Sequence, residues 1–334
     1  MAKRGVEEQI SALSQLRGGP VTEATLAALR KGLSDRVNLV CAKAAQVAGE
    51  IGAHQLIPEL AAAFERSFRN RGEADQQCWA KIAIAKALTI LGHDESATFL
   101  PGCRYVQMEA VWGGKTDTAI VLRSLCTLAL VQCADLPRAA KLRHLVVSMT
   151  DKEETVRIDA IRAIEQMEGE EAALLLRLKA ALGDQRAVVT GQALESLLRV
   201  EGERGLDFAR EFLLERTLDN PREMRSTPEE AVEEAALALG ASRLPGAVDA
   251  LKEAWRQVPK LVYLQAISAS RQESGFAFLL ELVTSGRERD AAAAVDALAL
   301  NRDSPEVRSR GEAAVQARND IQLSERFRTK FCVR

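Results

Sequence analysis

Side chains that commonly carry out chemistry are few and scattered in this sequence. The three histidines, His54, His93 and His144, have no Glu beside them and no Cys or His at the spacing of a metal site. A protein metal ion needs several such ligands converging from neighbouring positions. We therefore expect no metal and no other cofactor.

The segment 113–116 reads Gly-Gly-Lys-Thr and resembles the end of a phosphate-binding loop. The complete motif needs a further Gly at position 109, where Glu109 would instead repel phosphate. A weaker hypothesis is an anion bound by the free amides of a helix that begins near Thr116.

Nucleophilic catalysis has no better support. No Gly-x-Ser-x-Gly motif occurs, and of the cysteines before the final segment only Cys103 lies in a predicted loop, where a thiol could react. Because no catalytic constellation emerges, we predict a protein that is not an enzyme.

The composition excludes several classes of protein. The 334 residues carry a net charge of −2 and 47% are hydrophobic, which is too hydrophobic for a disordered chain and too neutral for one that coats nucleic acid. The sequence has no run of about 18 apolar residues, so we expect no membrane-spanning helix. The first residues lack the apolar core of a signal peptide. The six cysteines form no Cys-x-x-Cys pair, so we expect a reduced, cytoplasmic protein.

The elements that must position any site follow from an internal repeat. Apolar residues recur at positions i, i+4, i+7, i+8 and i+11, which form one stripe of an α-helix. Copies of this template begin about 36 residues apart, enough for two helices and two turns. Full copies begin at Val40, Ala80, Leu122 and Val156. The copy at Val189 has one polar lapse, the copy at Pro228 begins with Pro, and weaker copies begin near Lys260 and Ala291.

A second amphipathic stretch follows most copies, as in 137–148 and 247–257, and no segment shows the two-residue alternation of a strand. We therefore predict an all-α chain of about nine helix pairs without β-strands. Trp79 and Trp255 lie inside helical patterns, and we expect both side chains in the core.

The segments VRIDAIRAIEQMEG (156–169) and EEAVEEAALALGASRLPGAVDAL (229–251) resemble HEAT and HEAT-like repeats of the PBS-lyase type. The resemblance covers about residues 6–318. It implies a right-handed superhelical α-solenoid, here one continuous domain over 1–318 with caps near 6–36 and 288–318. Residues 319–334 are then a frayed tail.

Most proteins of this family, as the resemblance implies, are scaffolds that bind a protein or peptide partner, and this is the leading functional hypothesis. The longest break in the repeat, the insertion 101–117, is the candidate binding loop because it holds both Tyr and Trp with basic residues beside them. The candidate binding residues in and just after it are Arg104, Tyr105, Met108, Trp112, Lys115, Asp117 and Arg123.

Nucleic acid is the alternative partner. Residues 1–150 hold 18 basic and 14 acidic side chains, and some HEAT-like proteins are DNA glycosylases that use Trp, Asp and Arg on a basic face. The basic patch of this alternative comprises Arg66, Arg69, Arg71, Lys81 and Lys86. A third possibility, a lyase that acts on a protein-attached pigment, depends on family analogy alone.

Overall fold

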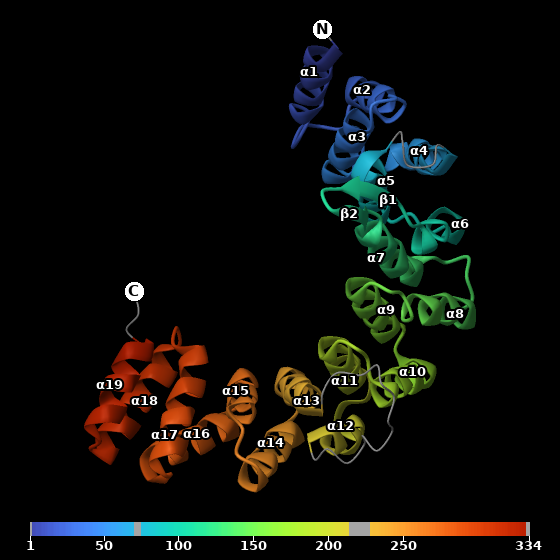
Figure 1. Cartoon of the computed structure of the whole chain (residues 1–334). Coiled ribbons are helices and arrows are strands. Elements are labelled where there is room, and N and C mark those ends of the chain that lie inside the picture. The colour runs from blue at the N-terminus through green and yellow to red at the C-terminus, as the bar shows by residue number, and fades with distance from the viewer. Residues whose placement is uncertain (1, 70–74, 214–227, 332–334) are drawn as a thin grey trace. The chain divides into compact units, whose positions relative to one another are not determined.

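The structure is a computed structural model that describes residues 2–69, 75–213 and 228–331. Arg71 of the predicted basic patch therefore lies outside the described residues. The chain divides into two compact units, Met1–Met167 and Glu168–Arg334. Each unit is built mainly from short helices joined by tight turns (Figure 1).

The N-terminal unit contains mainly helices, with one pair of strands between α6 and α7. Its elements are α1 (Ala2–Ser14), α2 (Glu23–Leu33), α3 (Asn38–Glu50), η1 (His54–Leu56), α4 (Ile57–Arg69), η2 (Gln76–Cys78), α5 (Trp79–Ile90), α6 (Ser96–Phe99), η3 (Gly102–Arg104), β1 (Met108–Val111), β2 (Gly114–Asp117), α7 (Ile120–Ala129), η4 (Leu130–Gln132), α8 (Arg138–Ser148) and α9 (Glu154–Met167).

The C-terminal unit is helical throughout the part that the structure describes. Its elements are α10 (Gly169–Leu182), α11 (Ala187–Glu201), η5 (Gly202–Gly205), α12 (Leu206–Leu213), α13 (Pro228–Ser242), α14 (Pro245–Gln257), α15 (Leu261–Ala269), α16 (Glu273–Ser285), α17 (Glu288–Leu298), η6 (Ala299–Asn301), α18 (Pro305–Arg318) and α19 (Ile321–Phe331).

Alternate helices pack against each other within each unit. In the N-terminal unit α1, α3, α5, α7 and α9 each contact the next in this series, and in the C-terminal unit α11, α13, α15, α17 and α19 do the same. The repeat template supplies these contacts: Ala80, Ile84, Ala87, Leu88 and Leu91 of the α5 copy are all buried. Small residues at the middle positions let the neighbouring helix approach closely, so the stripe read from the sequence is the core of the unit.

A predominantly helical fold is confirmed for the described residues, but two local expectations are wrong. Residues 108–117 form a β-hairpin where no strand was expected. The segment expected as a frayed tail contains α19, which buries Leu323, Phe327 and Phe331. An aromatic face of this size gains more from packing than a free end gains from chain entropy. Continuity of all repeats in one domain stays a prediction.

None of the helices within the described ranges is long and apolar enough to cross a lipid bilayer.

Candidate functional site

The insertion 101–117 forms a short 3₁₀ helix followed by a β-hairpin with a tight turn. Strands β1 and β2 pair antiparallel, with Met108 opposite Asp117 and Val111 opposite Gly114. The loop between them has two residues, Trp112 and Gly113, and Gly113 adopts φ +89°, a conformation that glycine accepts without strain. The Gly-Gly-Lys-Thr sequence lies in this turn and in β2, and not at a helix start, so the helix-terminus anion site near Thr116 is wrong.

A buried ion-pair network holds one side of the hairpin. The carboxylate of Asp117 accepts hydrogen bonds from the amides of Gln107 (3.1 Å) and Ala119 (3.0 Å) and from Arg123 Nη1 (2.7 Å). Arg123 Nε also donates to Asp151 Oδ2 (2.8 Å), and the Arg123 side chain is only 1% exposed. Burial alone would raise the pKa of Asp117, but these hydrogen bonds lower it below its usual value.

A second set of contacts joins the hairpin to the start of α5. Gln107 Nε2 donates to the carbonyl of Asp75 (2.7 Å) and to the carboxylate of Glu109 (2.6 Å). Lys81 Nζ bonds the Asp75 carboxylate (3.1 Å) and lies 5.1 Å from the centre of the Tyr105 ring. Because both sides of its base are fixed, the hairpin presents its turn in a defined position.

The structure separates the predicted binding residues into two groups. The Trp112 side chain is fully exposed (105%), and Arg104, Met108 and Lys115 are exposed as well. The half-buried ring of Tyr105 packs edge-on against Phe68 at 5.1 Å. Asp117 and Arg123 are buried and already paired with each other, so they position the hairpin and do not reach its surface.

The predicted basic patch does not form one surface. Lys81 is fully buried on Asp75, because a cation at this position completes the hairpin network. Arg66 donates to the Leu33 carbonyl (3.1 Å), and Arg69 pairs with Glu65 on its own helix (2.6 Å). Of the described members only Lys86 is exposed without a partner of its own, and it lines an apolar groove between α3 and α5.

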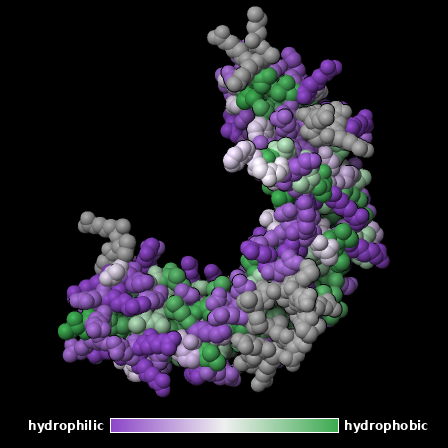
Figure 2. Space-filling model, viewed as in Figure 1, coloured by the Kyte–Doolittle hydropathy of each residue, from purple (hydrophilic) through white to green (hydrophobic). Residues whose placement is uncertain are grey.

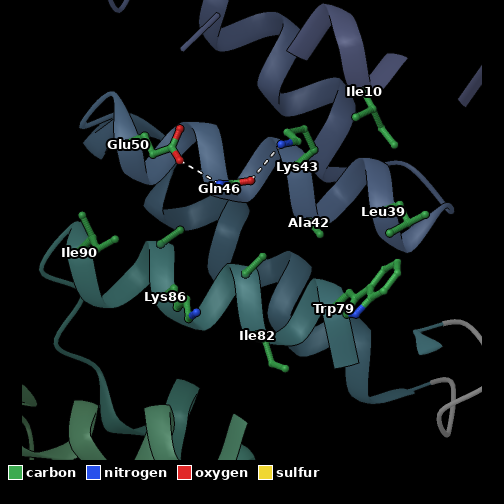
Figure 3. A pocket seen from close by; sticks show the side chains of 12 residues that line it. Ile10, Leu39, Ala42, Lys43, Gln46, Glu50, Trp79, Ile82, Lys86 and Ile90 are labelled. Atoms are coloured by element: carbon green, nitrogen blue, oxygen red, sulfur yellow. Dashed lines mark hydrogen bonds between the residues drawn. The ribbon is translucent and has the colours of Figure 1, made fainter. Parts of the chain in front are cut away.

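An apolar groove of about 540 Å³ runs between α3 and α5 in the N-terminal unit (Figure 3). Trp79 and Leu39 lie toward one end of it, Ile90 lies toward the other end, and Ile82 lies between them. The expectation that Trp79 belongs to the core is wrong, since 44% of its side chain is exposed, whereas Trp255 is buried as expected. Figure 2 shows hydrophobic residues reaching the surface of both units among hydrophilic ones.

Two lysines lie on opposite walls of this groove. Lys43 of α3 donates to Gln46 Oε1 (3.1 Å), and Lys86 of α5 has no carboxylate within ion-pair distance among the described residues. At one end Glu50 already bonds Arg17 (2.8 Å) and Gln46 (2.9 Å). The groove is therefore apolar with uncompensated positive charge.

The sequence held a signal for this groove that the repeat template concealed. Ten of its twelve lining residues occupy the same offsets in both helices, namely one position before the template start and 2, 3, 6 and 10 positions after it. These offsets define a second face of each helix, which a surface helix usually fills with polar residues. In α3 they are Leu39, Ala42, Lys43, Gln46 and Glu50, and in α5 they are Trp79, Ile82, Ala83, Lys86 and Ile90.

Reactive and metal-binding chemistry finds no geometric support in the described ranges. No group of three or more His, Cys, Asp or Glu side chains there is placed to hold a metal ion. Cys103 lies in a 3₁₀ turn and not in a loop, and burial raises the pKa of its thiol to about 12. A thiol with so high a pKa is a poor nucleophile at neutral pH, so Cys103 has the character of an ordinary buried cysteine, and only its predicted placement in a loop is wrong.

Comparisons with known proteins give no family. No protein-family model matches the sequence, and no curated protein matches it. Among solved structures, the chain is similar to an engineered protein from the Northeast Structural Genomics Consortium at 16% identity and a TM-score of 0.37. That alignment covers 100% of this chain and 96% of the engineered one. A similarity at this score carries no argument about fold or function.

Proposed function

We propose that the protein is a non-enzymatic scaffold of HEAT-like helix pairs, arranged as a right-handed superhelical solenoid, that binds a protein or peptide partner. The contacts between alternate helices within each unit support the repeat architecture. A helix pair of this size cannot bury its apolar face alone, and stacking on neighbours supplies the missing contacts. In each pair the helix that carries the repeat template is the first helix. Such stacking leaves available to a partner the face of each first helix that contacts neither its pair mate nor the neighbouring first helices.

The observation that carries the binding role is the groove around Trp79. Trp79, Ile82 and Ile90 remain partly or largely exposed in it, although burying such side chains is favourable by about 25 cal/mol for each Å² removed from water. A partner segment with large apolar side chains would cover them, and Lys43 and Lys86 would favour one that also carries acid groups. Trp is among the residues most enriched in binding hot spots.

Capture of a partner by wild-type and Trp79→Ala protein tests this role. Proteins retained from an extract of the native host are identified by mass spectrometry, and their affinity is then measured with purified partner. We expect Trp79→Ala to weaken binding by about 2 kcal/mol, as for a hot-spot residue. Leu174→Ala, which truncates a side chain 56% exposed in the other unit, is the matched control and should bind as wild type does. Equal binding by all three proteins would refute the groove.

The hairpin is a second contact candidate, and Trp112→Ala examines it separately. Since the Trp112 side chain is fully exposed, its truncation should change the free energy of unfolding by no more than about 0.5 kcal/mol. A loss of partner affinity with an unmoved melting curve would identify a binding anchor. A large fall in melting temperature would show that the ring packs against its own chain.

Binding to nucleic acid, the alternative function, is tested by measuring how strongly the protein is retained on immobilised DNA. Binding to phosphates weakens steeply between about 50 and 200 mM salt. Because Lys81 is buried and Arg69 is paired, we expect no retention even at the lower salt concentration. Strong, salt-sensitive retention would favour the alternative function.

A further inference from the structure

A second groove lies wholly within the C-terminal unit, along α11, α13 and the turns that follow α13 and α15. Its volume is about 680 Å³. Three of the side chains that line it are apolar and exposed, namely Val188, Leu237 and Leu300. Arg243 and Arg271 also line it, and we refer to this site as the arginine groove.

The backbone at these two arginines is unusual. Arg243 and Arg271 adopt φ +55° and +56°, each directly after the last turn of a first helix. In the N-terminal unit glycines fill the corresponding turns, Gly52 at φ +69° and Gly92 at φ +73°. A left-handed conformation is strained for any residue with a Cβ atom. Strain of this kind is concentrated at functional positions, so two arginines in place of two glycines indicate a role for their side chains.

The two turns are neighbours. Gln272, the residue after Arg271, donates from Nε2 to the carbonyl of Arg243 at 2.6 Å. Both arginines therefore extend from adjoining turns at one end of the arginine groove.

Neither guanidinium is engaged by the protein itself. Within residues 2–69, 75–213 and 228–331, Arg243 and Arg271 are exposed and their guanidinium groups have no hydrogen-bond or ion-pair partner. Other arginines of the same unit are paired, as Arg310 is with Glu273 (2.6 Å). Two unpaired, planar donors on adjoining turns are suited to a carboxylate, which each can bind in a forked arrangement.

The arginine groove also contains acidic side chains, and Glu234 is one of them. Glu234 lies nine residues before Arg243 on α13, about 13 Å along the helix axis at 1.5 Å per residue. It fits there because position 191 is glycine, where an added Cβ would lie 2.7 Å from Glu234 Oε2. Glu195 of α11 also lines the groove but pairs with Arg199, so Glu234 is the carboxylate that would repel an acidic ligand, and such a ligand is favoured at Arg243 and Arg271.

We propose that the arginine groove binds a peptide segment in which an Asp or Glu accompanies a large apolar residue. The carboxylate is held by Arg243 and Arg271, and the apolar side chain rests on Leu237 and Leu300. This site is separate from the groove around Trp79, and it takes a ligand chosen by its carboxylate.

Substitution with glycine tests the proposal without unfolding the protein. The double variant Arg243→Gly/Arg271→Gly removes both guanidinium groups and relieves the left-handed strain, so its melting temperature should stay within about 2 °C of wild type or rise. The matched control is Arg287→Gln/Arg289→Gln, which removes two exposed charges at the N-terminal end of α17, whereas Leu300 of the groove follows its C-terminal end.

The probe is a set of fluorescein-labelled dodecapeptides with one Glu and one Leu at varied spacing in a Gly/Ser background, each paired with its Glu→Gln form. We expect wild-type protein and the control to bind at least one Glu peptide about tenfold more tightly than its Gln partner, with this preference lost in the glycine variant. Trp79→Ala should leave the preference unchanged, which separates this site from the proposed scaffold groove.

Three outcomes would overturn the proposal: no peptide in the set binds, the Gln peptides bind as well as the Glu peptides, or the glycine variant keeps the preference. Binding of a single-stranded oligonucleotide that the glycine variant loses, without peptide binding, would assign the arginines to phosphate instead.

Discussion

Replacing Arg123 with Met is the most demanding test of how the hairpin is held. The side chain donates to both oxygens of Asp151, to Asp117 and to the carbonyl of Tyr105. Met is similar in length and apolar, so Arg123→Met removes the charge and these hydrogen bonds while leaving little cavity. Asp117, 2% exposed, and Asp151, 15% exposed, then lose their shared cation.

The size of the effect follows from what remains. Breaking a buried ion pair by removing one partner costs about 3–5 kcal/mol, because an uncompensated charge stays buried. Two backbone amides still donate to Asp117, and Lys152 Nζ lies 3.7 Å from its carboxylate. These contacts offset part of the loss, so we expect a cost near the lower limit, about 3 kcal/mol at pH 7.

The cost should depend on pH in a defined direction. The pKa of Asp117 is lowered in the folded protein, so the stabilisation it contributes is present above the ordinary Asp value of about 3.9 and is lost as the pH falls through the lowered value. At about pH 3 and below, wild type progressively loses what the variant already lacks. The difference between the two proteins should therefore shrink in acid.

Urea unfolding followed by circular dichroism at pH 7 and pH 3 measures both effects. If the two units unfold in separate transitions, only the transition of the N-terminal unit should move. Arg69→Met is the control: its pair with Glu65 is exposed on both sides, 67% and 72%, and is worth no more than about 0.5 kcal/mol. A cost below about 1 kcal/mol for Arg123→Met at pH 7, or an equal cost at both pH values, would refute the reasoning.

Three further predictions concern packing. Gly102→Ala should destabilise the N-terminal unit by about 1–3 kcal/mol, because an added Cβ would lie 2.3 Å from Cys126 Sγ; a stability equal to wild type in the same urea titration would show that this contact relaxes freely. Burial raises the pKa of the Cys103 thiol to about 12, so in a Cys332→Ser background a disulfide reagent should label the native protein far more slowly than the urea-unfolded protein; rapid native labelling would contradict the burial. Phe327→Ala should cost about 3–5 kcal/mol, since this buried ring stacks on a second one in α19 at 4.1 Å; an unmoved melting curve would mean that the segment is the frayed end first expected.

Much of the helical framework could be predicted because its cause is local. The template that begins at Ala80 predicted the buried face of α5, and all five of its residues are buried. A periodic apolar stripe is enough to place a helix, since a surface helix forms mainly to bury one face. The second helices at 137–148 and 247–257 likewise correspond to α8 (Arg138–Ser148) and α14 (Pro245–Gln257).

The candidate sites could be predicted only in part. The insertion 101–117 was recognisable as a break in the repeat, and Trp112 is exposed as a binding residue must be. Its hairpin was missed because each strand has four residues, too few for alternation to be informative. Trp79 was assigned to the core because its helix is apolar on two faces, and periodicity alone does not say which face meets a neighbour.

The sequence by itself determined the repeat period, the helical class and most residues of the core, because each depends on the spacing of apolar side chains along one helix. Only the tertiary structure decided which charged side chains are buried in ion pairs and which remain exposed without a partner. Lys81 and Arg123 are buried in ion pairs whose partners lie in other elements or before the helix, whereas Arg243 and Arg271 are exposed and unpaired within the described part of the chain. Pairing is a matter of distance in space, and Arg123 and Asp151 are 28 residues apart in the chain. Coulomb energy depends on that distance and on burial, neither of which is written in the order of the residues.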